Sequence, residues 1–140
     1  MVKPSGRSTL YRLIEAGQLA HKALLVPLLE RGLEPGDDAV LFVLGRSGAS
    51  EARLAAESGL SSEALGPRLA RLFDRDLIVR QAVGSELAPG LALTERGERI
   101  RAVLADNWME LEHALLGELD EKQQRSLRRT LKRFVELLRL

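Results

Sequence analysis

The sequence predicts a mainly α-helical fold that contains one short β-hairpin, and three observations support this prediction. Hydrophobic residues make up 45% of the 140 residues but aromatic residues only 4%, and a core of Leu, Ala and Val suits helices better than a β-sandwich. Apolar residues recur at spacings of three and four through most of the chain, which is the period of an amphipathic helix. A short run rich in β-branched residues, 77–81, is separated from a second apolar run, 91–93, by a loop that contains Gly and Pro.

The first predicted helix is long. Residues 1–6 are polar and are expected to form a loose tail. The helix then begins at Ser8 or Thr9. Pro27 should kink it, because proline removes one backbone hydrogen bond, and Gly32 should end it.

A turn at 34–36 leads to a short second helix. Asp37 or Asp38 can cap its N-terminus, and Gly45 follows its last residue. Because residues 39–44 are all apolar, this helix is expected to be buried behind the elements that follow it.

The central stretch, residues 49–94, has the pattern of a helix-turn-helix followed by a β-hairpin. Ser50 can cap the first helix, because its hydroxyl accepts from a free backbone N–H, and Gly59 can end that helix in a left-handed conformation. Ser61 can cap the second helix. The inward face of this second helix is a stripe of three residues: Leu65, Leu69 and Leu72. In a helix-turn-helix the second helix enters the DNA major groove.

The hairpin is predicted to consist of a strand over 77–81, a loop over 82–90 and a return strand over 91–93. Thr94 can then cap a long helix that Gly117 ends. The hairpin therefore connects the second helix of the helix-turn-helix to a long C-terminal helix.

The last helix is amphipathic and basic. Asp120 can cap it, with Gln123 completing an approximate capping box. Residues 121–140 contain seven basic residues against two acidic ones, although the net charge of the whole chain is only +1. The apolar residues of this helix recur at spacings of four, three and four: Leu127, Leu131, Phe134 and Leu138. The long terminal helices carry more apolar surface than one helix-turn-helix can cover, so we expect a C2 homodimer.

Several motifs in this arrangement resemble the MarR family of winged-helix transcriptional regulators. They are Leu54-Ala55-Ala56 with Gly59-Leu60-Ser61, Arg71-Leu72, Leu77-Ile78-Val79, and Leu93-Thr94-Glu95-Arg96-Gly97. The resemblance covers nearly the whole chain. It implies a single MarR-like module, in which residues 37–94 form the winged helix-turn-helix and residues 8–32 and 95–140 form dimerisation helices.

The resemblance implies a sequence-specific, homodimeric DNA-binding repressor that a small phenolic or lipophilic effector releases from a pseudo-palindromic operator. The two recognition helices of such a dimer lie one turn of DNA apart, about 34 Å. A second interpretation stays open, namely a MarR-like protein with weakened DNA binding that acts as a protein-interaction or ligand-binding module. The outward face of the second helix carries no basic residue, and the Asp-x-Arg that family members usually have in the wing is absent from residues 83–90.

The candidate DNA-binding residues are polar residues at helix N-termini and the arginines near them. The first group can present hydroxyls, a carboxylate and free N–H groups to phosphates or base edges, and the arginines can pair with phosphates. Serines that only cap helices, and arginines that are structural or solvated, are the alternatives. The candidates are Ser50, Arg53, Ser61, Ser62, Glu63, Arg68, Arg71, Arg75 and Arg80.

Four side chains could line an effector pocket by analogy with the family: His21, Phe42, Trp108 and Met109. Ordinary core packing is the alternative. With no Cys and only two His, no metal site and no cofactor are expected. The sequence contains neither a nucleophile elbow nor a Gly-rich phosphate loop, so no enzyme is expected. With no targeting signal and no apolar run long enough to span a membrane, we expect a cytoplasmic protein.

Overall fold

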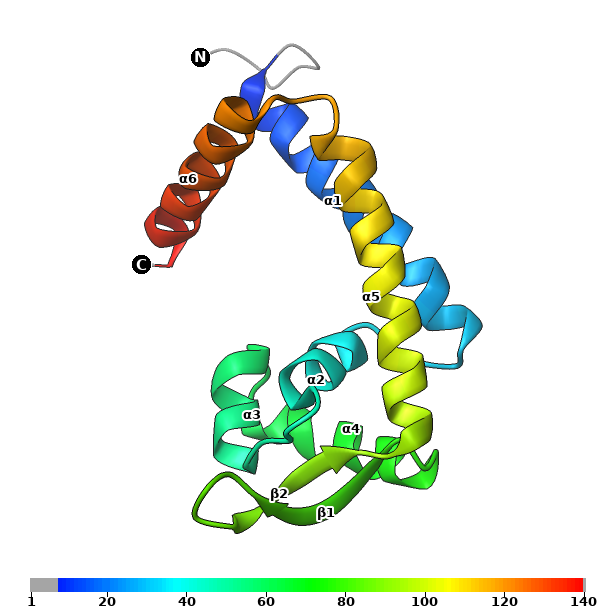
Figure 1. Ribbon diagram of the computed structural model, residues 1–140. Helices are drawn as coiled ribbons and strands as arrows, with labels where there is room; N and C mark the ends of the chain where they lie inside the picture. Colours follow the sequence, from blue (N-terminus) through cyan, green and yellow to red (C-terminus); the bar gives the residue numbers. More distant parts are fainter. Residues whose placement is uncertain (1–7, 140) are drawn as a thin grey trace. The chain divides into compact units, whose positions relative to one another are not determined.

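The computed structural model describes residues 8–139 and has the predicted mainly helical architecture with one hairpin (Figure 1). In chain order the elements are α1 (Thr9–Glu30), α2 (Asp37–Leu44), α3 (Glu51–Ser58), α4 (Ser62–Asp74), β1 (Ile78–Val83), β2 (Ala88–Leu93), α5 (Glu95–Leu116) and α6 (Glu121–Leu138). The tail expected over residues 1–6 lies outside the described residues. Among residues 8–139, no helix has the length and apolar character needed to cross a bilayer.

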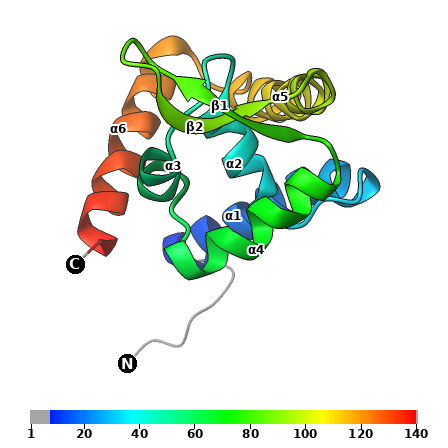
Figure 2. The ribbon, with the colours of Figure 1, turned by 90° about the horizontal axis from the view of Figure 1, so that it is seen from below.

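The chain divides into two compact units, and the boundary lies within α5. The first unit extends to Asp106 and the second begins at Asn107. In the first unit, α2 contacts both α3 and β2, and α4 contacts β1 (Figure 2). The predicted recognition helix and the hairpin therefore belong to one packed body.

The core of the first unit is built mainly from leucines. The predicted inward face of α4 is confirmed, because Leu65, Leu69 and Leu72 are at most 6% exposed. The expected burial of α2 is also confirmed by its fully buried residues. The other buried members of this core are Leu28, Leu33, Val40, Leu41, Leu44, Ala49, Leu54, Leu77, Ile78, Leu91 and Leu104.

Most helix termini follow the predicted capping chemistry. The side chains of Ser8 and Ser50 cap α1 and α3, and Asp120 caps α6 in a complete capping box with Gln123. The Thr94 hydroxyl accepts from the Gly97 N–H at 3.0 Å, at the start of α5. Each of these bonds joins groups three residues apart, so the local sequence is enough to define it.

The prediction for the start of α2 is wrong. Neither Asp37 nor Asp38 is its N-cap, because Gly36 occupies that position with a left-handed φ of 96° and makes no side-chain cap. The Asp37 carboxylate instead turns back, and one of its oxygens accepts from the Glu34 N–H at 2.8 Å. This arrangement leaves the other carboxylate oxygen available to residues distant in sequence.

The hairpin is longer than predicted, and we refer to it below as the wing. The register runs from Ile78 opposite Leu93 to Val83 opposite Ala88, so only residues 84–87 form the turn. The predicted loop over 82–90 is therefore too long. Pro89 and Gly90 suggested a loop, but a two-stranded hairpin tolerates Pro because each strand has a free edge where no N–H is needed.

The second unit contains the end of α5 and the whole of α6. The Gln124 amide donates to the Leu116 and Leu119 carbonyls, at 2.8 and 3.1 Å, and so closes the turn between the two helices. No described residue of α6 is buried. Its predicted apolar stripe is accordingly exposed.

Candidate nucleic-acid interface

The helix-turn-helix is formed by α3, a tight turn and α4. Gly59 ends α3 in the left-handed conformation, with φ of 75°. The Ser50 and Ser61 hydroxyls accept from the Arg53 and Ala64 N–H groups, each at 3.1 Å. The capping interpretation of both serines is therefore confirmed. A capping hydroxyl still has its own hydrogen to donate, so capping and phosphate contact are compatible.

The N-terminus of α4 is open to solvent. Ser61, Ser62 and Glu63 are all exposed, and α4 continues through Gly66 and Pro67 to Asp74. The predicted outward face is confirmed, since four residues at helical spacing are exposed: Glu63, Pro67, Ala70 and Asp74. The N-terminus can offer hydroxyls and backbone N–H groups to DNA, and the outward face carries two carboxylates but no cation.

Two of the candidate arginines on α4 point away from this face and toward Asp37. Asp37 is 0% exposed, and its Oδ1 accepts from Arg68 Nη1 and from Arg71 Nη2, both at 2.6 Å. Arg68 also donates to the Pro35 carbonyl at 2.8 Å, and Arg71 pairs with Glu34 at 3.2 Å. We call Glu34, Asp37, Arg68 and Arg71 the Asp37 cluster.

The Asp37 cluster is a charged network around one fully buried carboxylate. The hydrogen bond that Arg71 donates to Asp37 raises the pKa of Arg71, and the nearby carboxylates outweigh the lowering effect of burial. Within residues 8–139 the buried Nε atoms of Arg68 and Arg71 have no hydrogen-bond partner. The carboxylate of Asp37 therefore compensates two guanidinium groups whose solvation is incomplete.

Arg75, the C-cap residue of α4, is exposed and contacts the same segment of the chain. Its guanidinium lies against Gly32, where a Cβ would collide with Nη1, and Gly32 has φ of 71°. Similarly, the Arg68 guanidinium lies beside Gly36. Arg68, Arg71 and Arg75 thus all contact segment 32–37, which runs from the end of α1 to the first residue of α2.

Arg53 and Arg80 form exposed ion pairs at the edge of the helix-turn-helix. Arg53 Nε lies 2.7 Å from Glu57 Oε2, one helical turn away on α3. Arg80 Nη1 on β1 lies 3.0 Å from Glu51 Oε1 on α3, and its guanidinium stands over the Phe73 ring of α4, 5.2 Å from the centroid. Arg80 thereby links α3, α4 and the wing.

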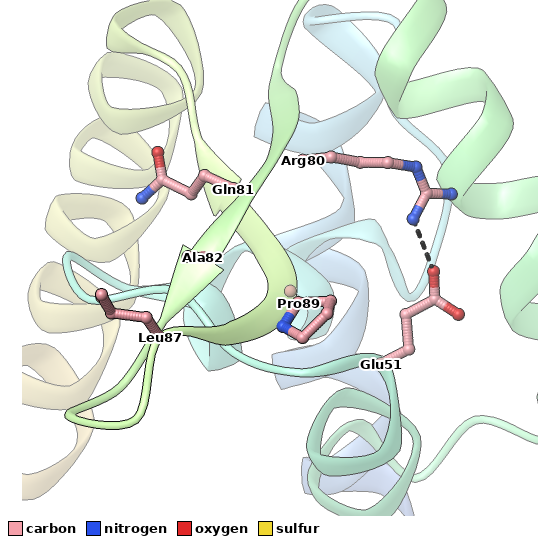
Figure 3. A pocket seen from close by; sticks show the side chains of 7 residues that line it. Glu51, Arg80, Gln81, Ala82, Leu87 and Pro89 are labelled. Atoms are coloured by element: carbon pink, nitrogen blue, oxygen red, sulfur yellow. Dashed lines mark hydrogen bonds and ion pairs between the residues drawn. The ribbon is translucent and has the colours of Figure 1, made fainter.

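An open hollow of about 580 Å³ lies between the first turn of α3 and the wing (Figure 3). Arg80 and Glu51 face each other across one side of it, and Leu87 marks the wing tip on another. Leu87 is 72% exposed with a positive φ of 52°. We call this site the wing hollow. The residues that line it are Glu51, Arg80, Gln81, Ala82, Leu87, Pro89 and Gly90.

The proposed effector-pocket residues belong to different units. His21 is exposed on α1, and Phe42 on α2 packs against the core of the first unit, as the packing alternative expects. Trp108 and Met109 are exposed on the part of α5 that belongs to the second unit. Met109 and His113 also line a separate hollow of about 390 Å³ between α5 and α6. No group of three potential metal ligands occurs within residues 8–139.

Sequence reasoning missed two participants, Asp37 and Glu34. The available signal was the pair Arg68 and Arg71, which lies near the leucine face of α4 and so requires a buried partner. The identity of that partner could not be read from local spacing, because Asp37 is 31 and 34 residues from the two arginines.

Comparison with protein-family models and with curated proteins finds no match. Solved structures do match along nearly the whole chain. A MarR family protein of Mycobacterium tuberculosis in complex with p-aminosalicylic acid is 23% identical, with TM-score 0.63, and the match covers 91% of this chain and 98% of that one. CouR from Rhodococcus jostii RHA1 bound to p-coumaroyl-CoA is 21% identical, with TM-score 0.76 and 94% of each chain covered.

A third match is BpsR of Bordetella bronchiseptica, whose structure concerns regulation of DNA binding by 6-hydroxynicotinic acid. It is 13% identical with TM-score 0.72, and the match covers 95% of this chain and 98% of BpsR. At these identities the comparisons establish the fold, which is the winged-helix fold found in MarR family transcriptional regulators.

Proposed function

We propose that this protein, which has the fold of MarR family regulators, is a sequence-specific DNA-binding repressor. It acts as a single MarR-like module, is not an enzyme, works in the cytoplasm and uses no cofactor. The observation that carries the proposal is the exposed N-terminus of α4 behind a capped turn, in a chain that aligns with such regulators over more than nine-tenths of its length.

Exposed apolar residues support a C2 homodimer. On α1 they include Leu10 and Ile14, and on α6 they include Phe134 and Leu138. Such residues on long helices are costly to leave in water, and a second copy would cover them symmetrically. Two α4 helices would then meet a pseudo-palindromic operator.

Ligands bound by the structural neighbours support an effector-controlled repressor. Two neighbours carry an aromatic acid or its CoA thioester, and the DNA binding of a third is regulated by an aromatic acid. A phenolic or lipophilic effector that binds best to a dimer conformation unable to fit the operator would lower the affinity for DNA. DNA would lower the affinity for the effector by the same factor. His21, Phe42, Trp108 and Met109 are the proposed lining residues.

Fluorescence anisotropy of the full chain with DNA from upstream of its own gene tests this function. Scrambled DNA of the same composition serves as competitor, and a salt series counts phosphate contacts through the slope of log affinity against log salt. We expect competitor-resistant binding by a dimer, with sedimentation measured in the same buffer. Weak binding that does not distinguish the two DNA sequences would contradict the repressor.

A second candidate function is a protein-interaction or ligand-binding module with little DNA affinity. The engagement of the α4 arginines with segment 32–37 favours it, together with the absence of basic residues from the wing tip. The double change Arg53→Gln and Arg80→Gln separates the two functions. With the upstream DNA as probe, the repressor predicts loss of binding with an intact dimer, whereas the module predicts that the already weak DNA binding of the wild type changes little.

A further inference from the structure

We infer that Arg80 is the contact of the wing with a DNA phosphate, and that Glu51 determines DNA affinity by competing with that phosphate for the Arg80 guanidinium. The inference rests on the proposed function and deepens it. In this inference the wing hollow binds the phosphodiester backbone of double-stranded DNA. Glu51 opposes that binding.

Arg80 is the only cation that the wing possesses. Residues 78–93 contain Arg80 as their single basic residue and Glu86 as their single acidic one. Electrostatic attraction between the wing and DNA must therefore pass through Arg80, because phosphate contacts are made chiefly by Lys and Arg.

The Arg80 guanidinium is exposed at the protein surface and lies over an aromatic ring. Its side chain extends across the Phe73 ring, which restrains the guanidinium plane, and it is 69% exposed. A guanidinium has five N–H donors, and the structure uses one of them, on Glu51. The remaining donors are available for a planar, bidentate contact with phosphate oxygens.

Glu51 occupies the place where a phosphate would bind. Its carboxylate is 54% exposed, lies 3.0 Å from Arg80 Nη1 and comes from the first turn of α3, the first helix of the helix-turn-helix (Figure 3). Carboxylate and phosphate oxygens accept from a guanidinium in the same geometry, so the two are mutually exclusive on the shared N–H.

The ion pair is weak enough to be exchanged. Both partners are more than half exposed, and pairs of this kind contribute little because water and salt screen them. The pair bridges α3 and β1, whereas the neighbouring pair of Arg53 and Glu57 lies within α3 alone. Binding to DNA would therefore exchange one intramolecular acceptor for an external one.

A double-mutant cycle with Glu51→Gln and Arg80→Gln in the full chain tests this competition, with the upstream DNA as probe. We expect E51Q to tighten binding by up to about fivefold. The slope of log affinity against log salt should change little on E51Q, because Arg80 contacts one phosphate in both proteins. R80Q should weaken binding and flatten that slope by about 0.9, the value for one lost phosphate contact. In the R80Q background, E51Q should have no further effect.

The cycle distinguishes competition from simple charge repulsion. If E51Q tightens binding by the same factor with and without Arg80, the carboxylate only repels DNA and the inference is wrong. If E51Q leaves the DNA affinity unchanged, the inference is also wrong. Glu86→Gln is the matched control, because Glu86 is an exposed carboxylate of the wing but is not the partner of Arg80. E86Q should leave affinity and slope unchanged.

Failure of the inference and failure of the proposed function give different results. If wild type and all variants bind upstream and scrambled DNA equally weakly, the repressor function fails and the inference fails with it. If wild type binds the upstream DNA specifically but the cycle is additive, the repressor stands and only the role of Glu51 is lost. Thermal unfolding of each variant confirms that the exposed substitutions leave the fold intact.

Discussion

Arg68 and Arg71 of α4 pair with carboxylates, as do Arg53 and Arg80 on neighbouring elements, but in opposite environments. Arg68 and Arg71 share one oxygen of Asp37, which is completely buried, at 2.6 Å. Arg53 and Arg80 each pair with a glutamate that stays at least half exposed. A cation that neutralises a buried carboxylate cannot leave without stranding that charge, whereas an exposed cation can exchange its partner with water or phosphate.

This difference in burial distinguishes arginines that hold the fold together from arginines whose guanidinium groups are free to change partners. The Asp37 cluster connects α4 to segment 32–37, which follows α1, and so positions α4. The exposed pairs lie where ligand and salt can reach them. In a helix-turn-helix the burial of the partner, more than the presence of arginine, indicates which cations are available to DNA.

The strongest test of this comparison is Asp37→Ala. Removing this fully buried carboxylate breaks both of its ion pairs and leaves Glu34 as the remaining carboxylate partner of Arg71, so the free energy of unfolding should fall by about 3 kcal/mol, the lower end of the range for a buried pair. Urea unfolding measures the loss. The adjacent substitution Asp38→Ala is the control, because the Asp38 carboxylate is partly exposed and accepts from the neighbouring Ala39 N–H. A loss below about 1 kcal/mol on D37A would mean that the buried network is not structural.

The next largest effect is expected at Gly36. Alanine there must adopt a φ of 96° and would press on the Arg68 guanidinium, 3.1–3.2 Å from the added Cβ. Gly59→Ala has a similar backbone cost, at φ of 75°, but meets no atom within 4 Å. The left-handed conformation alone costs about 1–2 kcal/mol, so G59A should lose that amount and G36A more. If thermal unfolding shows the same loss of stability for G36A and G59A, the Arg68 side chain can move to make room for the added Cβ.

A smaller effect is predicted for Ser61→Ala. It removes the hydrogen bond to the Ala64 N–H and should lower the free energy of unfolding by about 1 kcal/mol. Ser62→Ala, one residue further on, changes an exposed residue that is not the helix cap, so the free energy of unfolding should stay within about 0.5 kcal/mol of wild type. The repressor also predicts weaker operator binding for both variants, because each loses a hydroxyl at the N-terminus of α4. Unchanged binding would limit Ser61 to capping.

The smallest change in stability is predicted for Arg53→Gln. Its exposed pair with Glu57 spans one helical turn and contributes about 0.3–0.5 kcal/mol. The substitution should affect DNA binding more than it affects stability. If Arg53 contacts a phosphate, the slope of log affinity against log salt should flatten by about 0.9. An R53Q protein with unaltered slope but altered stability would place Arg53 among the structural arginines.

Element order and most boundaries could be predicted because their causes are local. Ser50, Ser61 and Asp120 each accept a hydrogen bond from a residue three positions ahead, and the leucine stripe of α4 repeats within one helix. The hairpin was underestimated because Pro89 and Gly90 signal a loop in isolation. Their pairing with Ala82 and Gln81 depends on the opposite strand.

By itself the sequence determined the mainly helical fold, the helix-turn-helix with its capped turn, the leucine face of α4 and the lack of cations on its outward face. Only the tertiary structure decided the roles of the arginines. The partners Asp37 and Glu51 lie 29 to 34 residues from Arg68, Arg71 and Arg80 in the chain, and no periodicity links residues at such separations. Burial of Asp37 and exposure of Glu51 arise when distant segments pack together, and that burial separates a structural cation from one that solvent can reach.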